Sequence, residues 1–129
     1  TNNKPGIAGA YATLNLLKSK PILKTIEKRG QRLMDGLKEI FEENDIQAVF
    51  TGYPAMFSFS FGIDTVSCQR DWAKSDHDLY IKLADRAIAR GVMPDRDARE
   101  PWFLCYEHSD ADIDETLNVY AEIVKEVKK

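Results

Sequence analysis

The chain has 129 residues and a net charge of −3, with 43% hydrophobic and 30% charged residues. That length fits one domain with a real core, and the scattered Lys and Arg residues argue against a nucleic-acid partner. The apolar runs are too short to cross a membrane and the first residues show no signal-peptide pattern. We therefore expect a cytoplasmic domain with no membrane partner.

The cysteines and histidines do not indicate a metal site. Cys68 and Cys105 match no metal or redox spacing, and the two histidines stand in unrelated contexts. Cys105 lies within an apolar run, so we expect it to pack as a small hydrophobic side chain. We predict no metal ligand in this chain.

The first predicted helix is apolar or small nearly all round. Pro5 suits the first turn of a helix, and residues 6–17 offer no polar face. Such a helix must be buried on most sides, either by a partner subunit or missing domain or as an ordinary central core helix. Because the sequence starts at Thr1 without Met, we expect a piece of a longer protein. Our division is residues 1–18, a buried helix after a missing large domain, and residues 19–129, a small α+β domain.

A long amphipathic helix of about 22–24 residues is expected from Pro21 to Asn44. Gly30 lies on its apolar stripe, where it would allow close helix packing. Two strands at 46–51 and 55–61 then form an antiparallel hairpin around a turn at 52–54.

Residues 62–74 are expected to form a loop, and a third helix runs from Ser75 or Asp76 to Gly91. Short extended segments follow at 92–94 and 102–106, and a last helix begins after Ser109. The predicted fold is α+β, a small, largely antiparallel sheet of three to four strands with helices packed on one side.

The segment 99–112 carries the polar candidates. Glu100 precedes the expected strand 102–106 and His108 follows it. Ser109 and Asp112 have the spacing of a capping box at a helix start. Polar residues at strand ends often carry chemistry in α/β proteins, but Glu100 can equally be a solvated loop residue, and His108 can simply orient the turn.

Three stretches resemble class III pyridoxal-phosphate-dependent aminotransferases, in particular the branch of glutamate-1-semialdehyde 2,1-aminomutases. Residues 3–14 are similar to the Gly-Asn-Pro and Ala-rich helix of the family, and residues 49–57 to its VTGxGSMF motif. Residues 91–113 are similar to GV…P…FEAxFxSxxHTxxDI. The three occur in the right order with matching gaps and span the chain.

The resemblance implies a fold type I enzyme that binds pyridoxal 5′-phosphate and acts as a homodimer on a small amino acid or amine. This chain would be its C-terminal small domain plus the preceding helix, covered by the large domain or the other subunit. Thr1 lies near the family's threonine that contacts the cofactor phosphate of the neighbouring subunit, one residue short of its spacing. The family's glutamate near the substrate pocket falls on Glu100, and His108 matches the motif's histidine, with a structural role expected.

Departures from the motifs put glutamate-1-semialdehyde itself in doubt as substrate. Cys105 replaces a common Ser, Lys4 replaces Asn, and Pro101 and Trp102 replace a small pair, so the wall beside Glu100 is bulkier. A related aminotransferase acting on another amino acid or amine is at least as well supported.

Catalysis by this chain alone is not expected. The Schiff-base lysine and the acidic partner of the pyridine nitrogen would lie upstream, and the lysines present stand among charged neighbours. We predict no catalytic residue in this chain and no cofactor bound by it alone. The alternative is a stand-alone α+β interaction or ligand-binding module.

Overall fold

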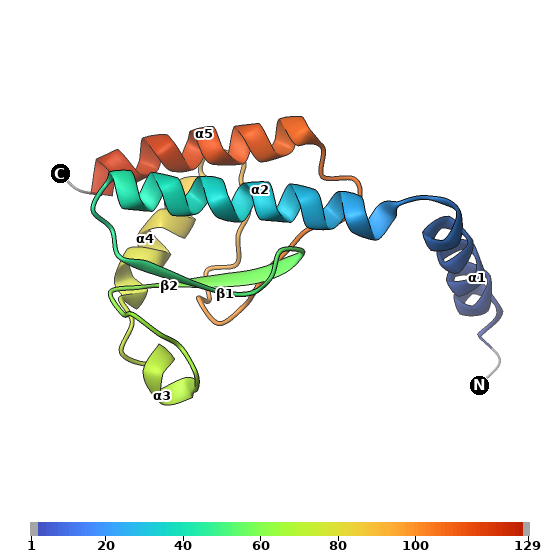
Figure 1. The fold of residues 1–129 in the computed structure, drawn as a ribbon, viewed down its shortest axis with the longest axis horizontal. Helices are drawn as coiled ribbons and strands as arrows, with labels where there is room; N and C mark the ends of the chain where they lie inside the picture. Colours follow the sequence, from blue (N-terminus) through green and yellow to red (C-terminus); the bar gives the residue numbers. More distant parts are fainter. Residues whose placement is uncertain (1–2, 128–129) are drawn as a thin grey trace.

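A computed structural model describes residues 3–127, and its elements form an α+β fold, as predicted (Figure 1). In chain order the helices and strands are α1 (Lys4–Ser19), α2 (Ile22–Glu43), β1 (Ala48–Tyr53), β2 (Met56–Phe61), α3 (Gln69–Trp72), α4 (His77–Ile88), β3 (Trp102–Phe103) and α5 (Asp110–Val127). Thr1, the candidate phosphate contact, lies outside the described residues.

The sheet has three strands in the order β1-β2-β3, and both pairings are antiparallel. Phe50 of β1 lies opposite Phe59, and Phe57 of β2 lies opposite Trp102. Helices α2 and α5 lie side by side along one face of this sheet, and α4 packs against α5 and β2 (Figure 1). The prediction of helices on one side is confirmed.

The core forms where β2 meets the helices. Phe57, Phe59 and Phe61 alternate along β2 and are all buried, as their spacing predicted. Phe41 of α2 packs against Phe61 edge-on, with ring centroids 5.0 Å apart. Tyr120 of α5 is also fully buried against Phe41 and closes the core from the helix side.

The hairpin turn differs from the prediction. Strand β1 continues through Gly52 to Tyr53, which pairs with Met56, so the turn consists of residues 54 and 55 rather than 52–54. Gly52 has φ +98°, which glycine adopts without the strain that a side chain would cause. The strand can therefore continue through this residue instead of ending at it. The first strand also begins later than expected, because the backbone N–H of Ile46 still donates to Phe41 at the end of α2.

Gly30 serves a different contact from the predicted one. A Cβ at this position would overlap the backbone carbonyl of Pro54. Close packing is therefore present, but it joins α2 to the hairpin turn instead of joining two helices.

Three further expectations were wrong. The predicted loop at 62–74 contains the one-turn helix α3. The predicted strand at 102–106 is only two residues long, and 92–94 is not a strand, so the sheet has three strands, the lower number of the predicted range. Leu104 still donates its N–H to Ala55, the next residue in the same register, but Ala55 belongs to the hairpin turn. Strand β3 therefore ends here, and a tight turn from Cys105 to His108 follows.

Helix α1 extends away from the rest of the molecule (Figure 1). None of its sixteen residues is buried, and Ile7, Tyr11 and Leu14 are 62%, 71% and 66% exposed. It is therefore not a central core helix of this chain, which removes one of the two interpretations that the sequence left open.

Candidate functional site

A groove of about 480 Å³ lies between the segment after α4 and the first turns of α5. Glu100 and His108, the two polar candidates from the sequence, both line it. The remaining lining residues are Leu33, Gly91, Val92, Met93, Pro94, Asp95, Pro101, Trp102, Phe103, Leu104, Asp112, Ile113, Glu115 and Thr116. The stretch 99–112 thus forms much of one continuous wall.

Buried aromatic side chains anchor this wall. The Tyr80 hydroxyl donates to the carbonyl oxygen of Asp95 at 3.1 Å and accepts from Trp102 Nε1 at 3.3 Å. Burial raises the pKa of Tyr80, so the phenol keeps the proton that it donates. The Trp102 indole packs against Phe57 and Tyr120, with ring centroids 5.8 and 5.5 Å away. Part of the bulk expected beside Glu100 is therefore accommodated in the core.

Glu100 is exposed, and its carboxylate makes no hydrogen bond or ion pair within residues 3–127, although its charge interacts with that of the neighbouring Arg99. Its backbone N–H, in contrast, is fixed by donation to the Asp97 carbonyl at 3.0 Å. The side chain is thus attached to an ordered turn and remains available to bind a group in the groove.

His108 is held within the turn that leads to α5. Its Nδ1 accepts the backbone N–H of Cys105 at 2.9 Å, and its own backbone N–H donates to the Cys105 carbonyl. Cys105 is exposed, so the prediction that it packs as a small core residue was wrong. The reason is that β3 has already ended, and the turn directs this residue to solvent.

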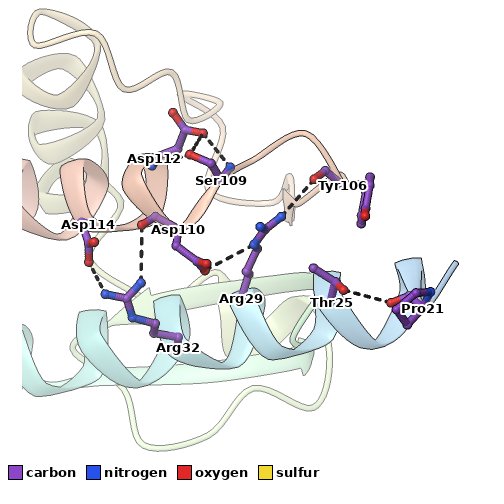
Figure 2. Close-up of polar contacts among 9 residues, drawn as sticks. All are labelled: Pro21, Thr25, Arg29, Arg32, Tyr106, Ser109, Asp110, Asp112 and Asp114. Atoms are coloured by element: carbon purple, nitrogen blue, oxygen red, sulfur yellow. Dashed lines mark hydrogen bonds and ion pairs between the residues drawn. The ribbon is translucent and has the colours of Figure 1, made fainter.

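The start of α5 has the predicted capping box. Asp112 Oδ2 accepts from the backbone N–H of Ser109 at 2.6 Å, and Ser109 Oγ accepts the Asp112 N–H at 3.2 Å (Figure 2). The hydrogen bonds from Ser109 hold the pKa of Asp112 below its usual range, with further help from His108 and Arg29. The end of the groove is therefore formed by an ordered helix N-terminus.

Two arginines of α2 tie this helix start to the rest of the domain (Figure 2). Arg29 donates to the carbonyl of Tyr106 at 3.0 Å and lies 3.3 Å from a carboxylate oxygen of Asp110. Arg32 forms an ion pair with Asp114 and donates to the Asp110 carbonyl at 3.4 Å.

The charges on the groove do not fit a bound phosphate group. Four carboxylates, those of Asp95, Glu100, Asp112 and Glu115, lie among its lining residues, and no Lys or Arg of the described chain does. A phosphate needs donors or cations around it. The groove therefore offers no cofactor-phosphate site, and its polar character suits a cation or a neutral polar group.

Within residues 3–127 no group of three or more His, Cys, Asp and Glu side chains is placed to hold a metal ion. No helix in the same range is long and apolar enough to span a membrane.

The sequence predictions missed two residues that hold the site from a distance, namely Arg29 and Tyr80. A signal existed for Arg29. It falls on the apolar stripe of α2, three residues after Ile26 and four before Leu33, where a cation needs a partner. Tyr80 has the pattern of an ordinary apolar residue of a helix, and no local signal distinguishes it.

The comparisons first define the fold. It matches that of the FumI protein of Sphingopyxis sp. MTA144, solved as its PLP internal aldimine form, with a TM-score of 0.75, 23% identity, and coverage of 94% of this chain and 26% of that one. It also matches a β-phenylalanine aminotransferase from Variovorax paradoxus, with a TM-score of 0.69, 18% identity, and coverage of 80% and 24%. The fold is that of the C-terminal small domain of fold type I aminotransferases.

The sequence comparison is more specific. The chain is 29% identical to the glutamate-1-semialdehyde 2,1-aminomutase of Thermoplasma acidophilum, over 100% of this chain and 30% of that protein. It is 31% identical to the same enzyme of Thermoplasma volcanium, over 98% and 30%. The resemblance predicted from the motifs is thus confirmed, and it is to a C-terminal part of these enzymes. The chain spans about 30% of the length of the relatives that it matches, and no family model matches it.

Proposed function

We propose that this chain acts as the C-terminal small domain of a pyridoxal-phosphate-dependent aminotransferase or aminomutase, and that its groove forms one wall of the substrate pocket. The observation that carries the proposal is the similarity along the whole chain to a C-terminal part of the aminomutases. The groove supports the proposal, because Glu100 and other residues of the third motif, at 91–113, lie together on its surface. The comparisons do not favour a stand-alone module.

The rest of the enzyme would supply what this chain lacks. A large domain preceding the helix of residues 1–18 would hold the cofactor, since the groove has no cation for a phosphate. That domain or the second subunit of a homodimer would cover the exposed apolar residues of α1, which the division into residues 1–18 and 19–129 anticipates. Thr1 would contact the cofactor phosphate of the neighbouring subunit. The assembled enzyme would work in the cytoplasm, and the isolated chain would be inactive.

Glu100 would contact the substrate away from the reacting carbon. A carboxylate that forms no ion pair attracts an ammonium group and repels a second carboxylate. Glutamate-1-semialdehyde carries a carboxylate at its far end, which the negative charge of the groove would repel. The charge, like the bulk of Pro101 and Trp102, therefore argues against this compound as the substrate. An amino acid or amine with a cationic or neutral distal group is the substrate class proposed here.

The test uses the full-length protein that contains this chain. Addition of an amine donor should change the absorption of the bound cofactor, and kcat/KM should be higher for donors with a distal ammonium than for donors with a distal carboxylate. Glu100→Gln should lower kcat/KM about fivefold for the ammonium donors and raise it about fivefold for the carboxylate donors, the effect of one unit charge at about 4 Å in a water-like medium. The ratio should therefore fall about 25-fold. Glu107→Gln, an exposed residue of the same segment outside the groove, should leave the ratio unchanged. Absence of any amine-dependent change would refute the enzyme assignment, and an unchanged ratio in Glu100→Gln would refute the role of Glu100.

A further inference from the structure

The turn that carries Glu100 separates two hollows. The groove described above lies on one side. On the other side is a second cavity of about 450 Å³, and its lining residues are Trp72, His77, Ile81, Asp95, Arg96, Asp97 and Ala98. Glu100 lines the groove, whereas its neighbour Arg99 lies over the Trp72 ring. Successive side chains of one turn thus contact different parts of the molecule.

Trp72 provides a fixed surface on the side of the second cavity. Its ring stacks on the imidazole of His77, with centroids 4.1 Å apart and planes 24° apart. Its carbonyl oxygen accepts from Ser75 Oγ at 2.7 Å and lies 3.1 Å from His77 Nε2. Helix α3, which the sequence did not predict, is therefore bound to the start of α4.

Arg99 bridges this surface and the turn. Its guanidinium carbon lies 5.9 Å from the centre of the Trp72 ring, a distance typical of a cation–π contact. Its Nε lies 2.9 and 3.0 Å from the two carboxylate oxygens of Asp97. Asp97 in turn accepts the backbone N–H groups of both Arg99 and Glu100, the first through its carboxylate and the second through its carbonyl. Two residues, Asp97 and Arg99, thus connect the backbone of Glu100 to the Trp72 ring.

A different group holds the beginning of the turn. The Asp97 N–H donates to Asp95 Oδ1 at 2.8 Å, and the Asp95 carbonyl is held by Tyr80. Ala98 is buried and inserts the middle of the turn into the core. With the start and middle already fixed, the contact of Arg99 with Trp72 acts on the end of the turn, where Glu100 lies.

We propose that Trp72 and Arg99 are positioning residues for Glu100: by holding the end of the turn against α3, they keep the Glu100 carboxylate on the groove and so sharpen its selection among substrates. This inference rests on the proposed function and adds to it a specificity device outside the groove. An exposed cation–π contact changes the population of a conformer about two- to fivefold. A change of that size in substrate discrimination is therefore expected.

The experiment measures the ratio of kcat/KM for donors with a distal ammonium and a distal carboxylate in the full-length enzyme. Trp72→Ala should lower the ratio about two- to fivefold. Trp72→Phe, which keeps an aromatic face, should restore most of it. In the Glu100→Gln background, Trp72→Ala should have no further effect on the ratio, because the positioned carboxylate is already gone. A merely structural role would not produce this dependence on Glu100.

Arg96→Ala provides the matched control. It removes a guanidinium from the same turn, but the ion pair it breaks is with Asp85 of α4. The ratio should stay at the wild-type value. If Trp72→Ala does not fold, Arg99→Gln tests the same link in both backgrounds.

The inference is overturned if Trp72→Ala and Arg99→Gln leave the ratio unchanged while Glu100→Gln alters it, a result that leaves the proposed function intact. It is also overturned if they lower the ratio equally in the wild-type and Glu100→Gln backgrounds. A silent Glu100→Gln variant refutes the role of Glu100 and this inference together.

Discussion

Arg29 donates a hydrogen bond from Nη1 to the carbonyl oxygen of Tyr106 at 3.0 Å, although 77 positions separate the two residues in the chain. The same guanidinium reaches Asp110 at the start of α5, so one side chain of α2 holds both sides of the turn that ends at that helix (Figure 2). The Arg29 side chain is only 20% exposed, so its hydrogen bond to the Tyr106 carbonyl is partly shielded from water, whereas the Asp110 carboxylate is 70% exposed and contributes less.

Replacement of Arg29 should therefore destabilise the domain. Arg29→Ala leaves the Tyr106 carbonyl and the Asp110 carboxylate without their donor, and hydrogen bonds to charged groups contribute about 1.5–3 kcal/mol. We expect a loss of this order in the free energy of unfolding, measured by urea denaturation of the chain. Arg29→Lys should fall between, since an ammonium cannot reproduce the fork of donors. The control is Lys28→Ala, an exposed cation one residue earlier, with a change within about 0.5 kcal/mol. Equal effects of the two alanine variants would contradict the assigned role.

Most of the fold was predictable because its signals are local and repeated. The alternation of Phe57, Phe59 and Phe61 predicted both the strand and its buried face. The apolar stripe of α2 and the capping residues of α5 predicted those helices near their observed limits. Helix α3 was missed because a single turn is too short to show a helical period. Strand β3 was overestimated because it ends where its partner strand reaches the hairpin turn at Ala55, a limit that the residues of β3 themselves do not show.

The candidate site was likewise predictable only where its signals are local in the sequence. Glu100 and His108 occur in one segment, so the sequence could place both near one wall. The contacts that order this wall join distant parts of the chain, such as Tyr80 with Asp95 and Arg29 with Tyr106. Their partners are backbone carbonyls, which every residue type carries. The sequence can indicate that Arg29 needs a partner, but no pattern of side chains identifies a backbone carbonyl as that partner.

Gly30 offers a test of the contact between α2 and the hairpin. A methyl group there would overlap the backbone of Pro54, which cannot move aside as a flexible side chain would. Gly30→Ala should lower the free energy of unfolding by about 1–3 kcal/mol, despite a gain in helix propensity of about 1 kcal/mol. Gly9→Ala is the matched control, because nothing lies within 4 Å of its added Cβ. That variant should raise the helix signal in circular dichroism without shifting the urea midpoint downward. A stable Gly30→Ala variant would show that the hairpin turn can move.

Asp97 should make the turn that carries Glu100 sensitive to acid. Its hydrogen bonds with Arg99 lower its pKa from the usual 3.8 to about 2. Because the folded pKa is depressed, the stabilisation is present above pH 3.8 and is lost as the pH falls through about 2. Wild type should therefore lose stability across this window, and Asp97→Asn should show a smaller loss. Carbon NMR of the carboxyl should give a midpoint near 2, rising toward 3.8 in Arg99→Gln. Asp78→Asn, an exposed acid of α4, should retain the wild-type pH profile. An Asp97 midpoint near 3.8 in the wild type would contradict the pairing.

Ser109→Ala should weaken the start of α5 and free Asp112 at the same time. The loss of an N-cap hydroxyl costs about 1 kcal/mol of stability. The Ser109 hydrogen bonds are also the main reason why the pKa of Asp112 is lowered, so this pKa should rise toward 3.8 in the variant. Since a depressed carboxyl pKa stabilises only while the group is ionised, the difference between wild type and variant should be full at neutral pH and shrink as the pH falls below 3.8. Urea unfolding at a series of pH values measures it. Ser67→Ala, an exposed serine before α3, serves as the comparison and should show no such trend. A difference that stays constant down to about pH 2 would mean that Ser109 stabilises the helix without its partnership with Asp112.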